Sequence, residues 1–197
     1  MDKMTDFEYY DSIKRSRRSY KNGIEVEGCW FRYYERPITY VSSYTVINLE
    51  GKVVLDIGAD WGSTPHFFIT QGAKRVIAVE GDQEYHARMR EHFKEEPNIV
   101  VVFKYIRAAK DIAKLIEEYK PDIVKIDCEG CERHLSMVQS HILKIPSDYM
   151  IETHLPYDIL ASLVTALCNA GFVCWKSTRG YDRNTGLQYF RRAKGER

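Results

Sequence analysis

The chain has 197 residues, which is enough for one well-buried domain with an appendage but short for two. Hydrophobic residues make up 44% and charged residues 29%, which is ordinary for a globular protein. The formal net charge of +1 is too small to attract nucleic acid or a membrane surface by the overall charge of the protein. No apolar run approaches the roughly 18 residues of a membrane span, and the first residues lack the apolar core of a signal peptide. We therefore expect a cytoplasmic protein with no membrane partner.

Residues 1–50 are predicted to form an N-terminal extension, either a lid over a site or an addition to the main sheet. Its expected elements are a helix over residues 1–23 and the two strands of a β-hairpin over residues 24–34 and 38–41. The helix carries five cations in the eight residues from Lys14 to Lys21. We interpret this run first as a solvated helix face or tail, and second as a patch for phosphate.

Residues 51–197 are predicted to form the main domain, in which strands and helices alternate. The expected strands are 53–57, 75–79, 99–103, 123–126, 149–151, 172–175 and 187–191. Helices are expected between them, among them one from about residue 132 to Pro146 and one over 157–169. The alternation predicts an α/β fold with a Rossmann-like, doubly wound sheet of seven mostly parallel strands. The loop between the last two strands is too short for a crossover helix, so the last strand is expected to be antiparallel.

The first strand of this domain ends in an acidic and glycine-bearing turn, Asp56-Ile57-Gly58-Ala59-Asp60-Trp61-Gly62, and the second strand ends at Glu80. Open α/β sheets bind ligands at the carboxyl ends of their strands, and glycines allow close approach to a ligand. A carboxylate at the end of the second strand can accept hydrogen bonds from both ribose hydroxyls. These features predict a cofactor that contains a nucleoside.

A dinucleotide oxidoreductase is the first alternative for this turn. Its fingerprint, G-x-G-x-x-G, has a glycine where this chain has Asp60. An acidic side chain at that position would clash with a pyrophosphate and repel its negative charge, and Asp56 would also repel it. The same acidity suits a cofactor with a positive sulfonium and no phosphate, and S-adenosylmethionine is such a cofactor.

The five cysteines are an odd number, which argues against a disulfide framework. The sequence Cys128-Glu129-Gly130-Cys131 has the C-x-x-C spacing of zinc sites and redox centres. A zinc site of that type needs a second close pair of ligands, which the chain does not offer clearly. We therefore expect small residues in a buried turn here.

Three segments carry a resemblance to a known family. Residues 54–62 resemble motif I of the class I S-adenosylmethionine-dependent methyltransferases, and residues 122–132 resemble the K-I-D-x-E-G-x-E signature of the FkbM-type methyltransferases. The segment Ile151-Glu152-Thr153-His154 is similar to the acid-x-His pattern at their fifth strand. The resemblance covers about residues 45–193 and implies S-adenosylmethionine as the cofactor. The cofactor-binding residues that it implies are Asp56, Gly58, Asp60 and Gly62 at the methionine end, Glu80 at the ribose, and Arg107 and Ala108 beside the adenine.

The acids and the histidine at strands four and five are the candidate catalytic residues. A hydroxyl that accepts a methyl group must lose its proton to a base. Asp127 is the first candidate for that base and His154 the second, while Glu129 and Glu152 would orient the acceptor or shift the pKa of the base. An alternative use of Asp127 and Glu152 is to bind a divalent cation, but our expectation is a site without metal.

Three functions remain open from the sequence. The first is FkbM-type O-methylation of a hydroxyl on a sugar or small metabolite, because strand four lacks the Asn/Asp-Pro-Pro-Tyr sequence of amino-group methylation. The second is methylation of tRNA or another RNA, in which basic clusters would hold phosphates. These clusters are Lys14–Lys21, Arg179, Arg183 and Arg191-Arg192-x-Lys194. The third is a non-catalytic module that has this fold and binds a partner.

Overall fold

The computed structural model describes residues 19–20, 23–26, 29–32, 43–179 and 185–193. The chain divides into two compact units. The first comprises residues 1–52 and 59–104, and the second comprises residues 53–58 and 105–197. Among the described residues, no helix has both the length and the apolar character needed to span a bilayer.

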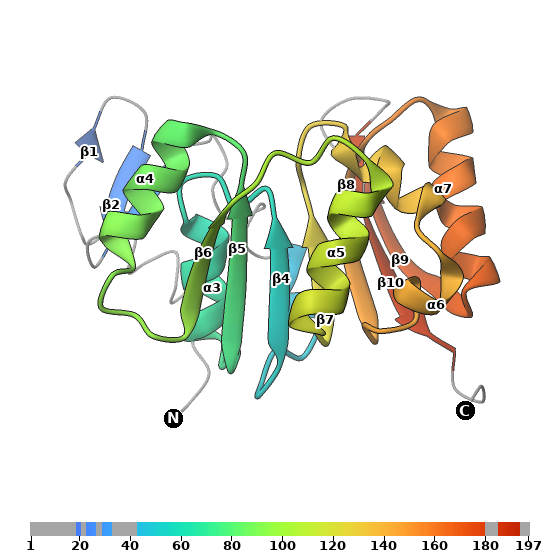
Figure 1. The fold of residues 1–197 in the computed structure, drawn as a ribbon, viewed down its shortest axis with the longest axis horizontal. Helices are drawn as coiled ribbons and strands as arrows, with labels where there is room; N and C mark the ends of the chain where they lie inside the picture. The colour runs from blue at the N-terminus through green and yellow to red at the C-terminus, as the bar shows by residue number, and fades with distance from the viewer. Residues whose placement is uncertain (1–18, 21–22, 27–28, 33–42, 180–184, 194–197) are drawn as a thin grey trace. The chain divides into compact units, whose positions relative to one another are not determined.

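The first unit contains a small antiparallel sheet and a parallel strand pair with its helices. Its elements are β1 (Ser19–Tyr20), β2 (Gly23–Val26), β3 (Cys29–Arg32), η1 (Ser43–Val46), α3 (Ser63–Thr70), β5 (Arg75–Glu80), α4 (Gln83–His92) and β6 (Ile99–Phe103). Strands β5 and β6 pair in parallel, and α4 packs on both of them (Figure 1). Helix α4 begins after Asp82, whose carboxylate accepts hydrogen bonds from the amides of Glu84 and Tyr85 as an N-cap.

The N-terminal elements differ from the prediction. Residues Ser19–Tyr20, expected in a helix, form β1, which pairs with β2; the remainder of that expected helix lies outside the described residues, as does the strand expected over 38–41. The single strand expected over 24–34 is instead the antiparallel pair β2 and β3, in which Val26 pairs with Cys29. The two residues between them, at positions 27 and 28, lie outside the described residues.

The second unit contains the first strand of the predicted domain and everything after residue 105. Its elements are β4 (Val53–Ile57), α5 (Ala109–Tyr119), β7 (Ile123–Ile126), η2 (Cys131–Met137), α6 (Ser140–Leu143), β8 (Asp148–His154), α7 (Tyr157–Asn169), β9 (Phe172–Arg179) and β10 (Thr185–Arg192). Strand β7 pairs in parallel with both β4 and β8. Strand β10 lies between β8 and β9 and is antiparallel to both.

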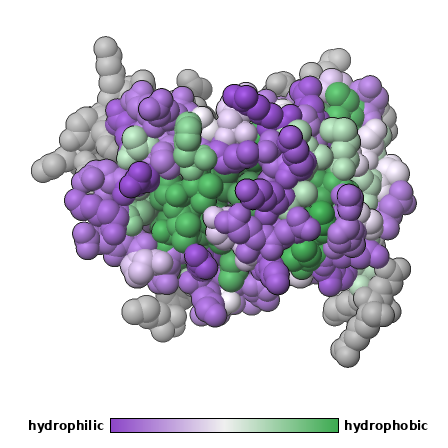
Figure 2. All heavy atoms as spheres, viewed as in Figure 1, coloured by the Kyte–Doolittle hydropathy of each residue, from purple (hydrophilic) through white to green (hydrophobic). Residues whose placement is uncertain are grey.

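The strand order of the large sheet is β6-β5-β4-β7-β8-β10-β9. This confirms the predicted sheet of seven strands with the last one antiparallel. Strand β7 is buried at every residue and β4 from Val54 to Ile57, as expected where helices cover a parallel sheet. On the face drawn in Figure 2, polar side chains predominate and apolar side chains form smaller areas between them.

The single helix expected from about residue 132 to Pro146 is replaced by two short elements, η2 and α6. In a 3₁₀ helix, side chains three residues apart lie above one another. Glu132 and Leu135 share this spacing with Val138, the residue that caps η2, and all three are buried. The three-residue period therefore places one face of η2 in the core, and the extended backbone of Val138 and Gln139 separates it from α6.

Candidate active site

The turn after β4 lies directly against the chain that leaves β7. Gly58 has a φ of +79°, and a Cβ at this position would lie 1.8 Å from the carbonyl oxygen of Asp127. The amide of Asp127 donates a hydrogen bond to the carbonyl of Ile57 at 3.0 Å. Only glycine fits this contact, so the first predicted cofactor glycine is required by the approach of two backbones.

Beneath this turn lies a buried ion pair. Lys125 Nζ is 3.0 Å from Asp56 Oδ1 and donates a hydrogen bond to the carbonyl of Gly58 at 2.7 Å, and neither charged side chain is exposed. Burial lowers the pKa of Lys125, but the carboxylates of Asp56 and Asp127 outweigh it, so the pKa is raised overall. This role of Lys125 was not predicted from the sequence. Its signal was a single cation in an otherwise apolar strand, since such a residue needs a buried partner.

In the first unit, the carboxylate of Glu80 accepts hydrogen bonds from the turn at Asp60 and from the turn that follows β5. Its Oε2 accepts a hydrogen bond from the amide of Asp60 at 2.9 Å, and its Oε1 accepts from the amides of Gly81 and Asp82 at 2.7 Å each. Asp60 itself has a φ of +50°, a left-handed conformation that aspartate tolerates better than most residues. A carboxylate oxygen has two lone pairs, so Oε2 keeps one acceptor position for a hydroxyl.

The end of the same turn is held by aromatic packing. Gly62 has a φ of +97°, and a Cβ there would lie 2.7 Å from the ring of Phe93. The ring of Trp61 packs against Tyr85 with 5.0 Å between centroids and a tilt of 40°, and the guanidinium of Arg88 lies 4.8 Å from the Trp61 ring. The segment from Asp60 to Gly62 therefore has a defined conformation within the first unit.

The predicted adenine-side residues, Arg107 and Ala108, lie at the start of α5. Both of their amides donate to Oδ2 of Asp111, at 2.9 and 3.1 Å. Asp111, which the sequence analysis did not select, thereby fixes this backbone. The side chain of Arg107 is exposed, with its guanidinium 5.7 Å from the ring of Tyr105.

The structure brings the four predicted catalytic residues together in the second unit. Asp127 follows β7, while Glu152 and His154 point to the same face of β8 because they are two residues apart. Asp127, Glu152 and His154 each offer a ligand atom, and these atoms all lie within 4.8 Å of one another. Glu129 completes the group, with Oε2 at 3.8 Å from Nε2 of His154. The three clustered residues are also of the types that bind divalent cations.

The cluster shifts the protonation of its members. Burial and the neighbouring carboxylate of Asp127 raise the pKa of Glu152 to about 7. The carboxylate of Glu132 raises the pKa of His154 to about 9, against the opposing effect of burial and with further contributions from Glu129 and Asp127. At neutral pH, His154 is therefore protonated, and Glu152 is partly protonated.

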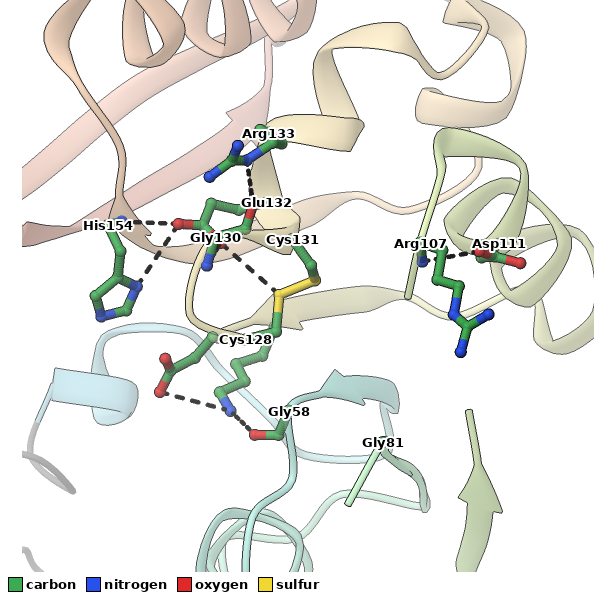
Figure 3. Close-up of a disulfide and its surroundings, with 12 residues drawn as sticks. Gly58, Gly81, Arg107, Asp111, Cys128, Gly130, Cys131, Glu132, Arg133 and His154 are labelled. Atoms are coloured by element: carbon green, nitrogen blue, oxygen red, sulfur yellow. Dashed lines mark hydrogen bonds and ion pairs between the residues drawn. A yellow bond between two sulfur atoms is a disulfide. The ribbon is translucent and has the colours of Figure 1, made fainter. Parts of the chain in front are cut away.

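Two features of the loop after β7 were not expected. Glu132 is fully buried, and its carboxylate accepts hydrogen bonds from the amides of Gly130 and His154 (Figure 3). Cys128 and Cys131 form a disulfide, which corrects the expectation of a turn without one. The reason is the backbone, because left-handed conformations at Glu129 and Gly130 bring the two cysteine Cα atoms to 5.5 Å, within disulfide range.

No protein-family model matches the chain. Among solved structures, it is similar to fibrillarin of Aeropyrum pernix with bound S-adenosyl-L-methionine, with a TM-score of 0.60 and 13% identity over 91% of this chain and 86% of that one. The Methanococcus jannaschii fibrillarin pre-rRNA processing protein gives a TM-score of 0.59 and 16% identity, with the same coverage. Precorrin-6y C5,15-methyltransferase of Geobacter metallireducens gives a TM-score of 0.58 and 14% identity over 89% of this chain and 100% of that one. The fold is therefore that of the class I S-adenosylmethionine-dependent methyltransferases.

Two viral proteins are similar in sequence. Uncharacterized protein 158B of Sulfolobus islandicus rod-shaped virus 1 is 28% identical over 111 residues, which are 56% of this chain and 64% of that protein. Uncharacterized protein 65 of Sulfolobus islandicus filamentous virus (isolate Iceland/Hveragerdi) is 33% identical over 116 residues, 58% of this chain and 67% of that protein. The matched segments thus span about two thirds of each relative. The chain belongs to the same family as protein 65 of the filamentous virus.

Proposed function

We propose that this protein is an S-adenosylmethionine-dependent methyltransferase that methylates a hydroxyl oxygen. The observation that carries the proposal is the group of Asp127, Glu152 and His154, whose polar atoms lie within 4.8 Å of one another at the ends of β7 and β8. In a methyltransferase fold, this edge of the sheet is where the chemistry is expected. A proton acceptor at this edge suits a hydroxyl nucleophile, which must be deprotonated as the methyl group moves.

The proton of the acceptor hydroxyl passes to the pair formed by Asp127 and Glu152. Two carboxylates this close do not both ionise freely, and the pKa of Glu152 near 7 matches a base that works at neutral pH. His154, with a pKa of about 9, acts as a cation that stabilises the ionised pair. The cofactor, when bound, supplies the electrophilic methyl group, and the protein contributes position and exclusion of water.

The cofactor is assigned to the residues at the ends of the first two strands of the domain. Gly58, Asp60 and Gly62 would present backbone to the methionine end, with Asp56 acting through its pair with Lys125. Glu80 would accept a hydrogen bond from one ribose hydroxyl with its remaining lone pair. Arg107 and Ala108 would lie at the adenine, held by a carboxylate of α5.

The acceptor in this proposal is a sugar or another small hydroxylated molecule, as the FkbM-type signature implies. Lys125, Asp127, Glu129 and Glu132 are the charged residues of that signature, and here one contiguous site uses all four. This joint use supports membership in that group of methyltransferases, because each charged residue of the signature has a structural or chemical task.

Calorimetric titration with S-adenosylmethionine and S-adenosylhomocysteine tests the proposal. Wild-type protein is expected to bind with a micromolar Kd, and Glu80→Gln to bind at least tenfold more weakly, because a charge-assisted hydrogen bond contributes roughly 1.5–3 kcal/mol. Asp82→Ala is the matched control, since it removes the N-cap of α4 next to Glu80 and lowers stability by about 1 kcal/mol without changing the cofactor affinity. Absence of binding by folded wild-type protein would refute the proposed cofactor.

RNA is the second candidate acceptor, favoured by the similarity to the fibrillarin pre-rRNA processing protein. Most of the basic residues of this hypothesis lie outside the described residues. Arg191 and Arg192 are described and already have structural partners: Arg191 bonds Asp148 at 2.7 Å, and Arg192 bonds the carbonyls of Lys144 and Pro146. Transfer of a labelled methyl group to total RNA or to a pool of small hydroxylated metabolites distinguishes the two acceptors. Labelled RNA with a steep salt dependence would favour the second.

A further inference from the structure

Glu132 is a fully buried carboxylate in the first turn of η2. An ionised carboxylate is unfavourable in the interior unless hydrogen bonds and a cation compensate it. Its Oε2 accepts a hydrogen bond from the amide of Gly130 at 2.8 Å, and its Oε1 accepts from the amide of His154 at 2.7 Å. One side chain therefore ties the loop after β7 to the end of β8, across 22 positions of sequence.

The same carboxylate also faces the ring of His154. Nδ1 of the ring lies 3.6 Å from Oε1 of Glu132 (Figure 3). Nε2, the other ring nitrogen, lies 3.8 Å from Oε2 of Glu129 and 3.9 Å from Oε1 of Glu152. Because Glu132 holds both the backbone and the Nδ1 edge of this residue, Nε2 is directed at the catalytic carboxylates.

We propose that Glu132 is the positioning residue of this site, which orients the ring of His154 and keeps it as a cation beside the Asp127–Glu152 pair. The chemical part rests on the proposed methyl transfer, whereas the geometric part does not. Among the described residues, the titratable groups that the structure places against His154 are acidic: Asp127, Glu129, Glu132 and Glu152. Only Glu132 is both fully buried and bonded to the backbone of His154, so solvent does not screen it.

The protonation of the two partners agrees with this geometry. The interaction with Glu132 is the largest contribution to the raised pKa of His154, which reaches about 9 although burial opposes it. Burial raises the pKa of Glu132, but its interactions with His154 outweigh burial, and the pKa is lowered overall. Each residue therefore stabilises the charged form of the other.

An NMR titration of His154 in the full chain tests the proposal, with the signal assigned by comparison with His154→Gln. Wild-type protein is expected to titrate near pH 9, and Glu132→Gln at least about one unit lower, a tenfold weaker proton affinity. Glu129→Gln is the matched charge control. It removes a carboxylate at a similar distance from the ring, but one whose side chain is 86% exposed, so its effect is expected to be smaller.

Several results would overturn the proposal. One is a wild-type His154 that titrates near its ordinary value of about 6.5, a measurement that needs no variant to fold. Another is a folded Glu132→Gln with unchanged titration, or a Glu129→Gln shift that equals it. Circular dichroism and thermal unfolding establish that each variant is folded before it is titrated.

The titration involves neither cofactor nor acceptor, so it separates this inference from the proposed function. If the protein fails to bind S-adenosylmethionine, the function is refuted while the pairing of Glu132 with His154 stands or falls on its own. Where methyl transfer is measurable, the alkaline limb of the kcat profile should move to lower pH in Glu132→Gln, with KM for the cofactor unchanged. A limb that stays in place while the titration of His154 moves would refute the chemical part.

Discussion

Lys125→Met is expected to destabilise the protein strongly, because it removes the cation from a buried ion pair. Lys125 and Asp56 are both fully buried, with 3.0 Å between Nζ and Oδ1. Removing one partner of a buried ion pair typically reduces the free energy of unfolding by about 3–5 kcal/mol. The carbonyl of Gly58 loses the 2.7 Å hydrogen bond from Nζ as well. For a chain of this length, about 4 kcal/mol corresponds to a fall in Tm of roughly 8–16 °C.

Urea denaturation at pH 7, followed by circular dichroism, measures this loss. Lys114→Met is the matched control, because Lys114 is exposed on α5 and the same substitution there should change the free energy of unfolding by less than about 0.5 kcal/mol. The double variant Asp56→Asn/Lys125→Met removes both charges. It is expected to lose at least about 2 kcal/mol less than the sum of the two single variants, since the two residues are in contact.

Two results would refute this reasoning. A loss below about 1 kcal/mol for Lys125→Met would mean that solvent or relaxation compensates Asp56, contrary to its complete burial. Additive single and double variants would mean that Lys125 and Asp56 do not stabilise each other. Either result would also argue against support of the turn after β4 by Lys125 through Gly58.

Three further predictions concern Gly58, the disulfide and the protonation of His154. Gly58→Ala should prevent stable folding, because its Cβ would overlap the Asp127 carbonyl, whereas Gly51→Ala, with a φ of +69° and open space around its Cβ, should reduce stability by only about 1 kcal/mol in the same urea assay. Reduction of the disulfide between Cys128 and Cys131 should lower the free energy of unfolding by only about 2 kcal/mol, because the closed loop is very short; denaturation with and without dithiothreitol measures this, and a much larger loss would contradict the loop-closure argument. The free energy of unfolding should fall as pH rises from about 6.5 to about 9, by at most about 3 kcal/mol, because the folded state keeps the His154 proton that the unfolded chain releases; this slope should disappear in His154→Gln.

The parts of the fold and site that local pattern determines were predictable from sequence. Strand and helix alternation indicated the seven-stranded sheet, because burial on both faces requires apolar runs between amphipathic helices. Gly58 and Glu80 could be recognised because their tasks, a close backbone approach and a strand-end carboxylate, depend on neighbours in the chain or on the fold class.

The features that sequence reasoning missed depend on distant partners. Lys125 donates a hydrogen bond to the carbonyl of Gly58, which lies 67 positions away in the sequence, and the residues of β7 alone do not indicate that partner. Glu132 takes part in the signature, but its burial depends on the packing of η2, which was predicted as an ordinary helix. The disulfide depends on two consecutive left-handed residues, and one of them is Glu129, a residue type that rarely adopts this conformation.

The exposure of the charged groups at the ends of β4, β7 and β8 explains how the site divides its tasks. Asp56 and Lys125 are fully buried and neutralise each other, so they hold the structure, and the pKa of Lys125 is raised. Glu132 is buried against the ring of His154, so its charge orients that ring. Asp127 and Glu152 are less deeply buried, with side chains 15% and 22% exposed, and Lys125 Nζ lies 3.9 Å from Oδ2 of Asp127. Burial and the neighbouring carboxylate of Asp127 raise the pKa of Glu152 to about 7, and the charges of His154 and Lys125 reduce this shift without cancelling it. In the proposed mechanism, the proton-accepting property of the site therefore depends on the positions of Lys125 and His154 beside deeper carboxylates.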